Sequence, residues 1–403
     1  MTNKTVEDFN KKYNKSFCIK PFTEYCNSTS NSLTLCCISD SYVTLDQDAD
    51  LLDTFYNHQL LQNTREKMLK GEYIEECKSC YEREKHKGIS PRIGYTNDMP
   101  LDIVEDAFAG NTELVSLDLK FGNVCNQGCV MCSPLVSSFL AKEQNKEAFL
   151  YNTGNLARLK NNAKNIIRFK TTGGEPMLQP GFEKSIDILL EHGSPATTDF
   201  NTVTNGTVDI CKLFTKMKKF KSFKVNYSLD AVNEETYKFV RYPGNFKKVK
   251  NNHNKLLQLV ATEDVNDTIQ ISFNVTIHIF NIHEIENIAR YISKLQDTYN
   301  NVEISFLFDY VDSPEQQNPS LLDKNILLTY IKNTEKVLKQ SNLIKDEVDN
   351  TILNLYNILE NCDYIENRQE KIEKLEKQIE YFKKLRNLDA YAIVPHLNHM
   401  LQR

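Results

Sequence analysis

Between about residues 111 and 310, short runs rich in β-branched and aromatic residues alternate with amphipathic stretches of helical spacing. The runs predict six strands, at 115–121, 166–173, 198–206, 223–230, 268–278 and 301–310. Helices are expected between them, for example at 181–193 and 282–296. Strands separated by helices are typical of βα units, which place their strands in a parallel sheet. Six units are too few to close an eight-stranded barrel, so we expect an α/β fold with an open, partial barrel.

The chain has 403 residues, more than one domain usually contains, and three segments are expected. These are a cysteine-rich module at 1–105, the partial barrel at 106–312 and a helical C-terminal extension at 313–403. Loop-forming residues at 312–320 mark the second boundary. In the extension, apolar residues recur at near-heptad spacing; they are Ile365, Ile372, Leu375, Ile379 and Phe382. The repeats are too few for a sustained coiled coil, so we expect this helix to pack onto the barrel.

Charge and hydropathy exclude several classes of protein. The longest apolar runs are far too short to span a bilayer, and the polar N-terminus lacks the apolar segment of a signal peptide. We therefore expect no membrane association, a cytoplasmic location and no disulfides. A net charge of -5 gives no general attraction to nucleic acid, so a nucleic-acid partner is not expected. The lysine-rich stretch at 211–223 is interpreted as a solvated helix surface.

Eleven cysteines are many for a chain in a reducing compartment, and nine of them precede residue 133. Clustered cysteine spacing in such a chain indicates metal or redox chemistry. The remaining two, Cys211 and Cys362, are expected to be small buried apolar residues, and Cys26 is given the same role.

Cys125, Cys129 and Cys132 stand at C-x3-C-x2-C spacing directly after the first predicted strand. In parallel α/β folds the chemistry gathers at the carboxyl ends of the strands, which is where this loop is expected. Three thiolates can hold three corners of a [4Fe-4S] cluster and leave one iron open, as a catalytic metal site requires. Zinc is the alternative occupant, but no histidine lies between Cys125 and Cys132 to complete a Cys/His zinc site.

The loop resembles the signature of the radical S-adenosylmethionine (radical SAM) superfamily, which follows the first strand of a partial (β/α)6 TIM-like barrel. Further motifs of that family follow in the same order: "GGEP" after the second strand, "TNG" after the third, "SLD" after the fourth and an arginine in "FVRYPGNF". Asn281 is a weaker match. By this resemblance, the cysteines are catalytic and S-adenosylmethionine is bound by Gly173, Gly174, Glu175, Pro176, Thr204, Asn205, Ser228, Asp230 and Arg241.

The resemblance implies an oxidoreductase or modifying enzyme. Its reduced open cluster cleaves S-adenosylmethionine to a 5′-deoxyadenosyl radical, which abstracts hydrogen from a substrate, and a flavodoxin or ferredoxin-type protein donates the electron. The substrate is expected to be a peptide or protein. A small-molecule dehydrogenase and a nucleotide-cyclising enzyme are the alternatives, and a non-catalytic iron–sulfur or zinc sensor is the alternative of another class.

The earlier cysteines resemble the auxiliary-cluster module called SPASM or twitch, although that module usually follows the barrel and here precedes it. Its four ligands are expected to be Cys18, Cys36, Cys77 and Cys80, with Cys37 as an alternative to Cys36. Four thiolates would saturate a second iron–sulfur cluster, expected to be [4Fe-4S], while a four-cysteine zinc site stays open as the other interpretation. Asn31 replaces the usual glycine of this module, and asparagine tolerates left-handed backbone.

Overall fold

The computed structural model describes residues 3–39, 41–46, 49–87, 90–148 and 156–401. The chain divides into two compact units. The first comprises residues 1–124, 147–201 and 219–221, and the second comprises residues 125–146, 202–218 and 222–403. Within the described ranges, every helix is too short or too polar to cross a membrane.

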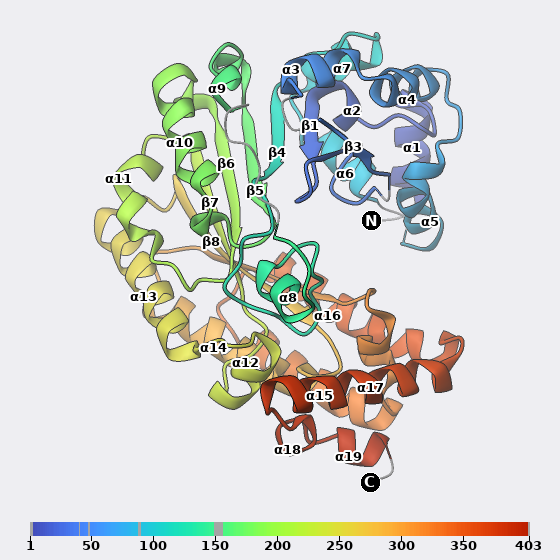
Figure 1. Cartoon of the computed structure of the whole chain (residues 1–403), viewed down its shortest axis with the longest axis vertical. Helices are drawn as coiled ribbons and strands as arrows, with labels where there is room; N and C mark the ends of the chain where they lie inside the picture. The colour runs from blue at the N-terminus through green and yellow to red at the C-terminus, as the bar shows by residue number, and fades with distance from the viewer. Residues whose placement is uncertain (1–2, 40, 47–48, 88–89, 149–155, 402–403) are drawn as a thin grey trace. The chain divides into compact units, whose positions relative to one another are not determined.

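The first unit contains a mixed sheet with the strand order β3-β2-β1-β4-β5. These strands are β1 (Glu24–Asn27), β2 (Ser32–Thr34), β3 (Val43–Thr44), β4 (Ser116–Lys120) and β5 (Arg168–Thr172). The short strand β2 pairs antiparallel with β1 and β3. Strand β1 pairs in parallel with β4, and β4 pairs in parallel with β5 (Figure 1). The register places Cys26 of β1 beside Asp118 of β4, and Asp118 beside Lys170 of β5.

Helices surround this sheet and supply an aromatic core. They are α1 (Asn3–Tyr13), α2 (Lys20–Thr23), α3 (Leu51–Asn57), α4 (Gln59–Leu69), α5 (Lys78–Lys87), α6 (Pro91–Asn97), α7 (Leu101–Phe108), α9 (Leu156–Leu159) and α10 (Pro180–His192). Phe17 packs its ring against Tyr13 at 5.5 Å, Phe22 at 5.6 Å and Phe108 at 5.1 Å between ring centroids. Rings at these separations bury large apolar areas, which stabilises the N-terminal part of the unit.

The second unit contains parallel strands β7 (Ser222–Ser228), β8 (Ile269–Ile277) and β9 (Ile304–Tyr310). Strand β6 (Asp199–Thr204) begins in the first unit and ends in the second. The central strand β8 alternates buried apolar residues with more exposed polar ones over much of its length, as a strand covered on one face does. The register pairs Ser228, the last residue of β7, with Asn274 of β8.

The helices of the second unit follow these strands and continue to the C-terminus. They are α8 (Ser138–Glu143), α11 (Phe214–Met217), α12 (Glu234–Val240), α13 (Phe246–Glu263), α14 (Ile285–Thr298), α15 (Lys324–Lys339), α16 (Lys345–Asn361), α17 (Arg368–Arg386), α18 (Ala390–Ile393) and α19 (Leu397–Met400). Helices α14 and α16 pack against β9, and α15 packs against both helices. Phe382 of α17 lies 5.8 Å from the ring of Phe239 in α12 and 6.3 Å from that of Phe280.

Each of the six predicted strands is present as β4 to β9, and the parallel pairing is confirmed for β4 with β5, β7 with β8 and β8 with β9. The sequence did not predict β1 to β3. The compact units cut across the predicted segments 1–105, 106–312 and 313–403, because β1 pairs with β4 and so joins the N-terminal residues to the strands that follow. Residues 1–2, 40, 47–48 and 88–89 of the predicted module lie outside the described residues.

Candidate functional site

The loop with Cys125, Cys129 and Cys132 is held by serine side chains at the start of α8. Ser138 Oγ accepts a hydrogen bond from Cys125 N at 3.0 Å and donates to Cys125 O at 3.2 Å. Ser137 caps α8 by accepting from Leu140 N at 3.3 Å, and its hydroxyl donates to Gln127 O at 2.6 Å. Both serines therefore bond to the backbone of the loop and help to hold its conformation.

The three thiols differ in their surroundings. Cys129 is 7% exposed, Cys125 is half-buried and Cys132 is exposed. The hydrogen bond with Cys132 lowers the pKa of the Cys129 thiol, and the Arg241 guanidinium lowers this pKa as well. The same hydrogen bond raises the pKa of Cys132. The buried Cys129 is therefore the thiol of this pair that lies beside a positive charge.

Arg241 and Asp230, both predicted to contact S-adenosylmethionine, bond to each other. Arg241 Nη2 lies 2.6 Å from Asp230 Oδ2, and Arg241 Nη1 lies 3.9 Å from Cys129 Sγ. Burial raises the pKa of the Asp230 carboxyl, while the arginine and a hydrogen bond from Thr276 N oppose this. Burial disfavours the charge of Arg241, but Asp230 and then Cys129 raise its pKa. The arginine thus places a permanent positive charge beside the middle cysteine.

The "TNG" turn after β6 is joined to the cysteine loop by an amide network. Asn205 Nδ2 donates to Asn126 Oδ1 at 2.9 Å and lies 4.0 Å from Cys125 Sγ. Asn126 Nδ2 in turn donates to Thr207 Oγ1 at 2.9 Å. Thr204 Oγ1 accepts from the N–H of Gly206, whose φ of 73° is in the left-handed region that glycine adopts readily. Asn126 and Thr207 were not identified from the sequence.

Ser228 and Asn281 lie at the carboxyl ends of β7 and β8. Ser228 is half-buried at the last position of β7. Asn281 is fully buried, and its side chain bonds to backbone groups of Asp230, Thr276 and His278 at distances between 2.7 and 2.9 Å. The amide of Asn281 therefore ties together the two strand ends that carry the site.

The "GGEP" loop belongs to the first unit. Gly173 and Gly174 have φ values of 80° and 58°, and a Cβ on Gly174 would lie 2.4 Å from Val124 O. Glu175 is buried and its N–H donates to Val124 O at 2.8 Å. Pro176 begins a short helical turn directly after it. Because Val124 immediately precedes Cys125 in the chain, the "GGEP" backbone fixes the residue from which the cysteine loop starts.

The four N-terminal cysteines predicted as ligands converge on one cavity of the first unit. Cys18, Cys36, Cys77 and Cys80 line about 350 Å³ of space, open solvent included, together with Glu76, Arg92 and Tyr95. Burial raises the pKa of Cys18 and that of Cys36 to about 12. Burial also raises the pKa of Cys77, and the charges of the other three thiols raise it further. Four thiols that influence one another electrostatically lie close together, as a shared metal centre requires.

The structure separates the two candidates for the second position of this set. Cys36 lines the cavity, whereas Cys37 is exposed and its Sγ lies 3.3 Å from the hydroxyl of Tyr95. Asn31 has a φ of 58°, so asparagine adopts the left-handed conformation expected at that turn. Beside the cavity, Arg92 is 1% exposed and forms a two-point contact with Glu84, with Nε–Oε1 at 2.8 Å and Nη2–Oε2 at 2.6 Å.

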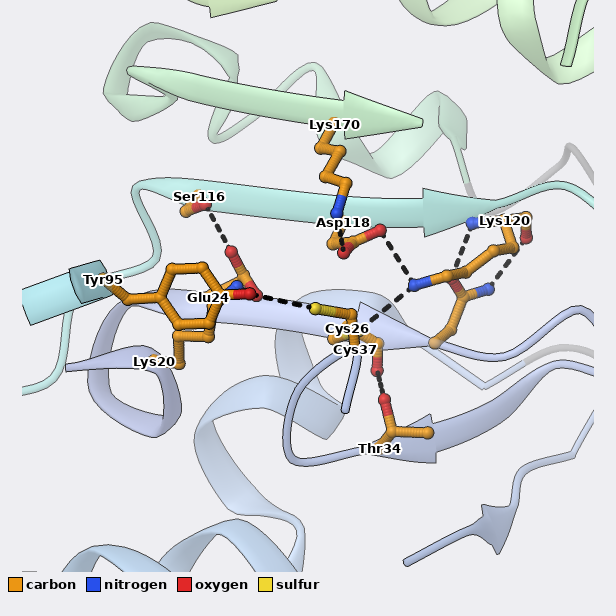
Figure 2. Close-up of polar contacts among 11 residues, drawn as sticks. Lys20, Glu24, Cys26, Thr34, Cys37, Tyr95, Ser116, Asp118, Lys120 and Lys170 are labelled. Atoms are coloured by element: carbon orange, nitrogen blue, oxygen red, sulfur yellow. Dashed lines mark hydrogen bonds and ion pairs between the residues drawn. The ribbon is translucent and has the colours of Figure 1, made fainter. Parts of the chain in front are cut away.

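Another buried polar group lies between β1, β4 and β5 of the same unit (Figure 2). Lys120 Nζ lies 2.8 Å from Asp118 Oδ1 and 3.4 Å from Cys26 Sγ. Lys170 Nζ lies 3.5 Å from Asp118 Oδ2. Cys26 was expected to be a small buried apolar residue, but its thiol contacts the charged Lys120. Burial raises the pKa of this thiol to about 12.

Glu24 completes this group and is paired with Lys20. Among the described residues, Glu24, Cys26 and Asp118 are the one set of three metal-ligating side chains whose donor atoms lie within 4.8 Å of one another. Both carboxylates are already neutralised by lysines, so the contacts favour an ion-pair network at this position over a cation site.

Comparison with known proteins relates part of this chain to a known family. Residues 119–292 match the family model of the Radical SAM superfamily. A GTP 3',8-cyclase of Desulforamulus reducens is 28% identical over 170 residues, which are 39% of this chain and 50% of the relative. A probable GTP 3',8-cyclase of Methanococcus maripaludis is 30% identical over 97 residues, 24% of this chain and 31% of the relative. The chain thus spans half or less of the length of these relatives.

Two solved structures are also similar. Streptococcus suis SuiB bound to S-adenosylmethionine is 16% identical, with a TM-score of 0.38 over 75% of this chain and 66% of SuiB. HydG, a maturase of the [FeFe]-hydrogenase, is 12% identical, with a TM-score of 0.34 over 74% of this chain and 70% of HydG. These TM-scores are too low to assign a function. The match over residues 119–292 shows that this part of the chain is similar to the Radical SAM superfamily, a family of enzymes that use a [4Fe-4S] cluster and S-adenosylmethionine.

Proposed function

We propose that this chain is a radical SAM enzyme with a partial (β/α)6 barrel, in which Cys125, Cys129 and Cys132 hold a [4Fe-4S] cluster. When bound, this cluster supplies one electron that cleaves S-adenosylmethionine to methionine and a 5′-deoxyadenosyl radical, which takes a hydrogen atom from the substrate. The observation that carries the proposal is the C-x3-C-x2-C loop directly after β4, inside the residues that match the family.

The residues around the loop fit such a cluster. Arg241 lies beside Cys129, where its positive charge would stabilise thiolate and the anionic cluster. We also propose that Arg241, while paired with Asp230, faces the carboxylate of S-adenosylmethionine.

We propose further that Gly173, Gly174, Glu175 and Pro176 hold the amino group of S-adenosylmethionine. The two glycines support this role because their φ values of 80° and 58° give the loop a tight turn that brings its backbone close to the start of the cysteine loop. Thr204, Asn205 and Ser228 are proposed to face the remainder of the cofactor from the ends of β6 and β7.

The N-terminal cavity is proposed to hold an auxiliary iron–sulfur cluster on Cys18, Cys36, Cys77 and Cys80. Four thiolates saturate a cluster, so this centre would transfer electrons and would not bind S-adenosylmethionine. An electron donor of the flavodoxin or ferredoxin type completes the proposal.

The substrate is proposed to be a peptide or protein. A nucleotide is the second candidate, because the relatives that share 28% and 30% identity with this chain are named GTP 3',8-cyclases. Incubating the reduced enzyme with S-adenosylmethionine and GTP separates the two: consumption of GTP together with formation of 5′-deoxyadenosine would replace the peptide proposal. If GTP persists, a short peptide encoded beside this chain's gene is the next substrate to supply.

The proposed function is tested by anaerobic purification followed by iron and sulfide analysis. Two [4Fe-4S] clusters predict about eight iron atoms per chain. Addition of S-adenosylmethionine and dithionite should then form 5′-deoxyadenosine. Cys129→Ala should abolish this product, whereas Cys211→Ala, a half-buried cysteine of the same unit outside both sets, should leave it unchanged. Intact clusters without the nucleoside would contradict the enzymatic proposal.

A further inference from the structure

Three side chains that follow β9 bond to backbone carbonyls of the cysteine loop. Arg386 Nη1 donates to Gly128 O at 2.7 Å, across 258 residues of sequence. Gln317 Nε2 and Gln378 Nε2 both donate to Val130 O, at 2.6 Å and 3.3 Å. Gly128 and Val130 are the residues on either side of Cys129. The peptide groups that flank the middle cysteine are therefore held by the C-terminal extension and the loop that leads to it.

Arg386 is itself held in place on several sides. It is 6% exposed, and its Nε and Nη2 atoms donate to the two carboxylate oxygens of Glu143 at 3.0 and 2.8 Å. The guanidinium also lies over the rings of Phe382 and Tyr242, at 4.8 and 5.0 Å from their centroids. A planar guanidinium that is paired, stacked and buried has little freedom to move, so its hydrogen bond to Gly128 has a fixed direction.

The sequence of the loop is adapted to this contact. A Cβ on Gly128 would lie 2.9 Å from Arg386 Nη2 and 2.8 Å from Phe139 Cδ1. Glycine at this position therefore lets the arginine reach the backbone. The N–H groups of the same residues are fixed as well, because Gly128 N donates to Tyr242 O at 2.6 Å and Val130 N donates to Val240 O at 2.9 Å.

We propose that Arg386 is a positioning residue for the cysteine loop, and that α17 thereby belongs to the site. The arginine, with Gln378, fixes the backbone on both sides of Cys129 so that its thiol keeps the orientation that a cluster needs. The inference rests on the proposed function, because only that function gives the loop a cluster to hold. The effect of Arg386 on the loop backbone can nevertheless be measured in the metal-free chain.

The anchoring of α17 is separate from this role. Leu375, Ile379 and Phe382 are buried along the helix and hold it by apolar packing. Substitution of Arg386 should therefore loosen the loop while the helix stays in place. Lys383, on the same helix, offers a matched control, because it is exposed and pairs with Asp389 at 2.8 Å.

The experiment compares Arg386→Gln, Arg386→Lys and Lys383→Gln. In the metal-free chain, amide hydrogen exchange of a peptide covering 125–132 should become about tenfold faster in Arg386→Gln, because a buried hydrogen bond to a charged donor is lost. In the loaded enzyme, iron of the loop cluster should be lost to a chelator about tenfold faster. Lys383→Gln should change neither rate, and Arg386→Lys should restore part of the protection because it keeps the charge.

Unchanged exchange and unchanged iron loss in a folded Arg386→Gln protein would overturn the inference. If Arg386→Gln does not fold, Arg386→Lys takes its place, since a lysine cannot keep both the bond to Gly128 O and the two-point pair with Glu143 and should speed exchange about threefold relative to the unsubstituted chain. No change in that folded variant would overturn the inference equally. A chain that binds no loop cluster would refute the proposed function, while the exchange rates of the metal-free chain would still decide the role of Arg386.

Discussion

Removal of one member of the buried Asp230–Arg241 pair should destabilise the second unit strongly. Asp230 is fully buried, Arg241 is 6% exposed and the two are 2.6 Å apart. Breaking a buried pair by removing one partner costs about 3–5 kcal/mol, because the other charge stays buried without compensation. Asp230→Asn keeps an acceptor for the 2.9 Å bond from Thr276 N, so its cost should come from the lost charge.

The double variant Asp230→Leu/Arg241→Met separates this charge effect from simple loss of packing. Replacing both charges by apolar side chains of similar size is roughly neutral in other buried pairs, so the double variant should be more stable than either single variant. Urea unfolding of the metal-free chain, followed by tyrosine fluorescence, measures each free energy of unfolding. Single variants that cost less than about 1 kcal/mol, or a double variant that costs the sum of both, would refute the reasoning.

Three further predictions concern other parts of the chain. Gly174→Ala should destabilise the chain by about 2–4 kcal/mol, because the backbone there is left-handed and the new Cβ would lie 2.4 Å from a carbonyl oxygen. Gly71→Ala is the control: Gly71 also has a positive φ, but its Cβ would lie 3.6 Å from the nearest atom, so the substitution should cost only about 1 kcal/mol. The same urea unfolding measures both variants. Burial lowers the pKa of His253 from 6.5 to about 3, so between these pH values the unfolded chain binds a proton that the folded chain does not. The free energy of unfolding should therefore fall by about 1.4 kcal/mol for each pH unit below 6.5. His253→Asn should make this dependence of the free energy of unfolding on pH shallower by the same amount. Cys36→Ser should lower the iron content by about four atoms per chain, while Cys37→Ser should leave it unchanged.

The strands of the barrel region could be predicted from the sequence because each is a run of alternating or continuous apolar residues bounded by turn residues. Strands β1 to β3 could not. They contain four, three and two residues, and β1 and β2 are buried at every position, so no alternation marks them. Their place beside β4 depends on long-range pairing, which local patterns do not encode.

For the site, the spacing of the three loop cysteines and the order of the motifs identified the residues but not their partners. Asp230 and Arg241 were each interpreted as contacts of the cofactor, and the structure shows that they bond to each other. The lysines beside Cys26 were missed, although Asp118 and Lys120 at alternate positions of an otherwise apolar strand were a signal of a buried polar face. Arg386 lies 258 residues from Gly128, and nothing in its local sequence points to that carbonyl.

The central claim is that the loop cluster has one iron that the chain leaves free for S-adenosylmethionine. Electron paramagnetic resonance of the dithionite-reduced enzyme, recorded with and without S-adenosylmethionine, tests it most directly. A Cys80→Ala variant that keeps the loop cluster allows its signal to be recorded apart from that of the N-terminal centre. If S-adenosylmethionine binds the free iron, the loop signal should change when the cofactor is added. A loop signal that stays the same at saturating S-adenosylmethionine would show that no iron of this cluster is open to the cofactor.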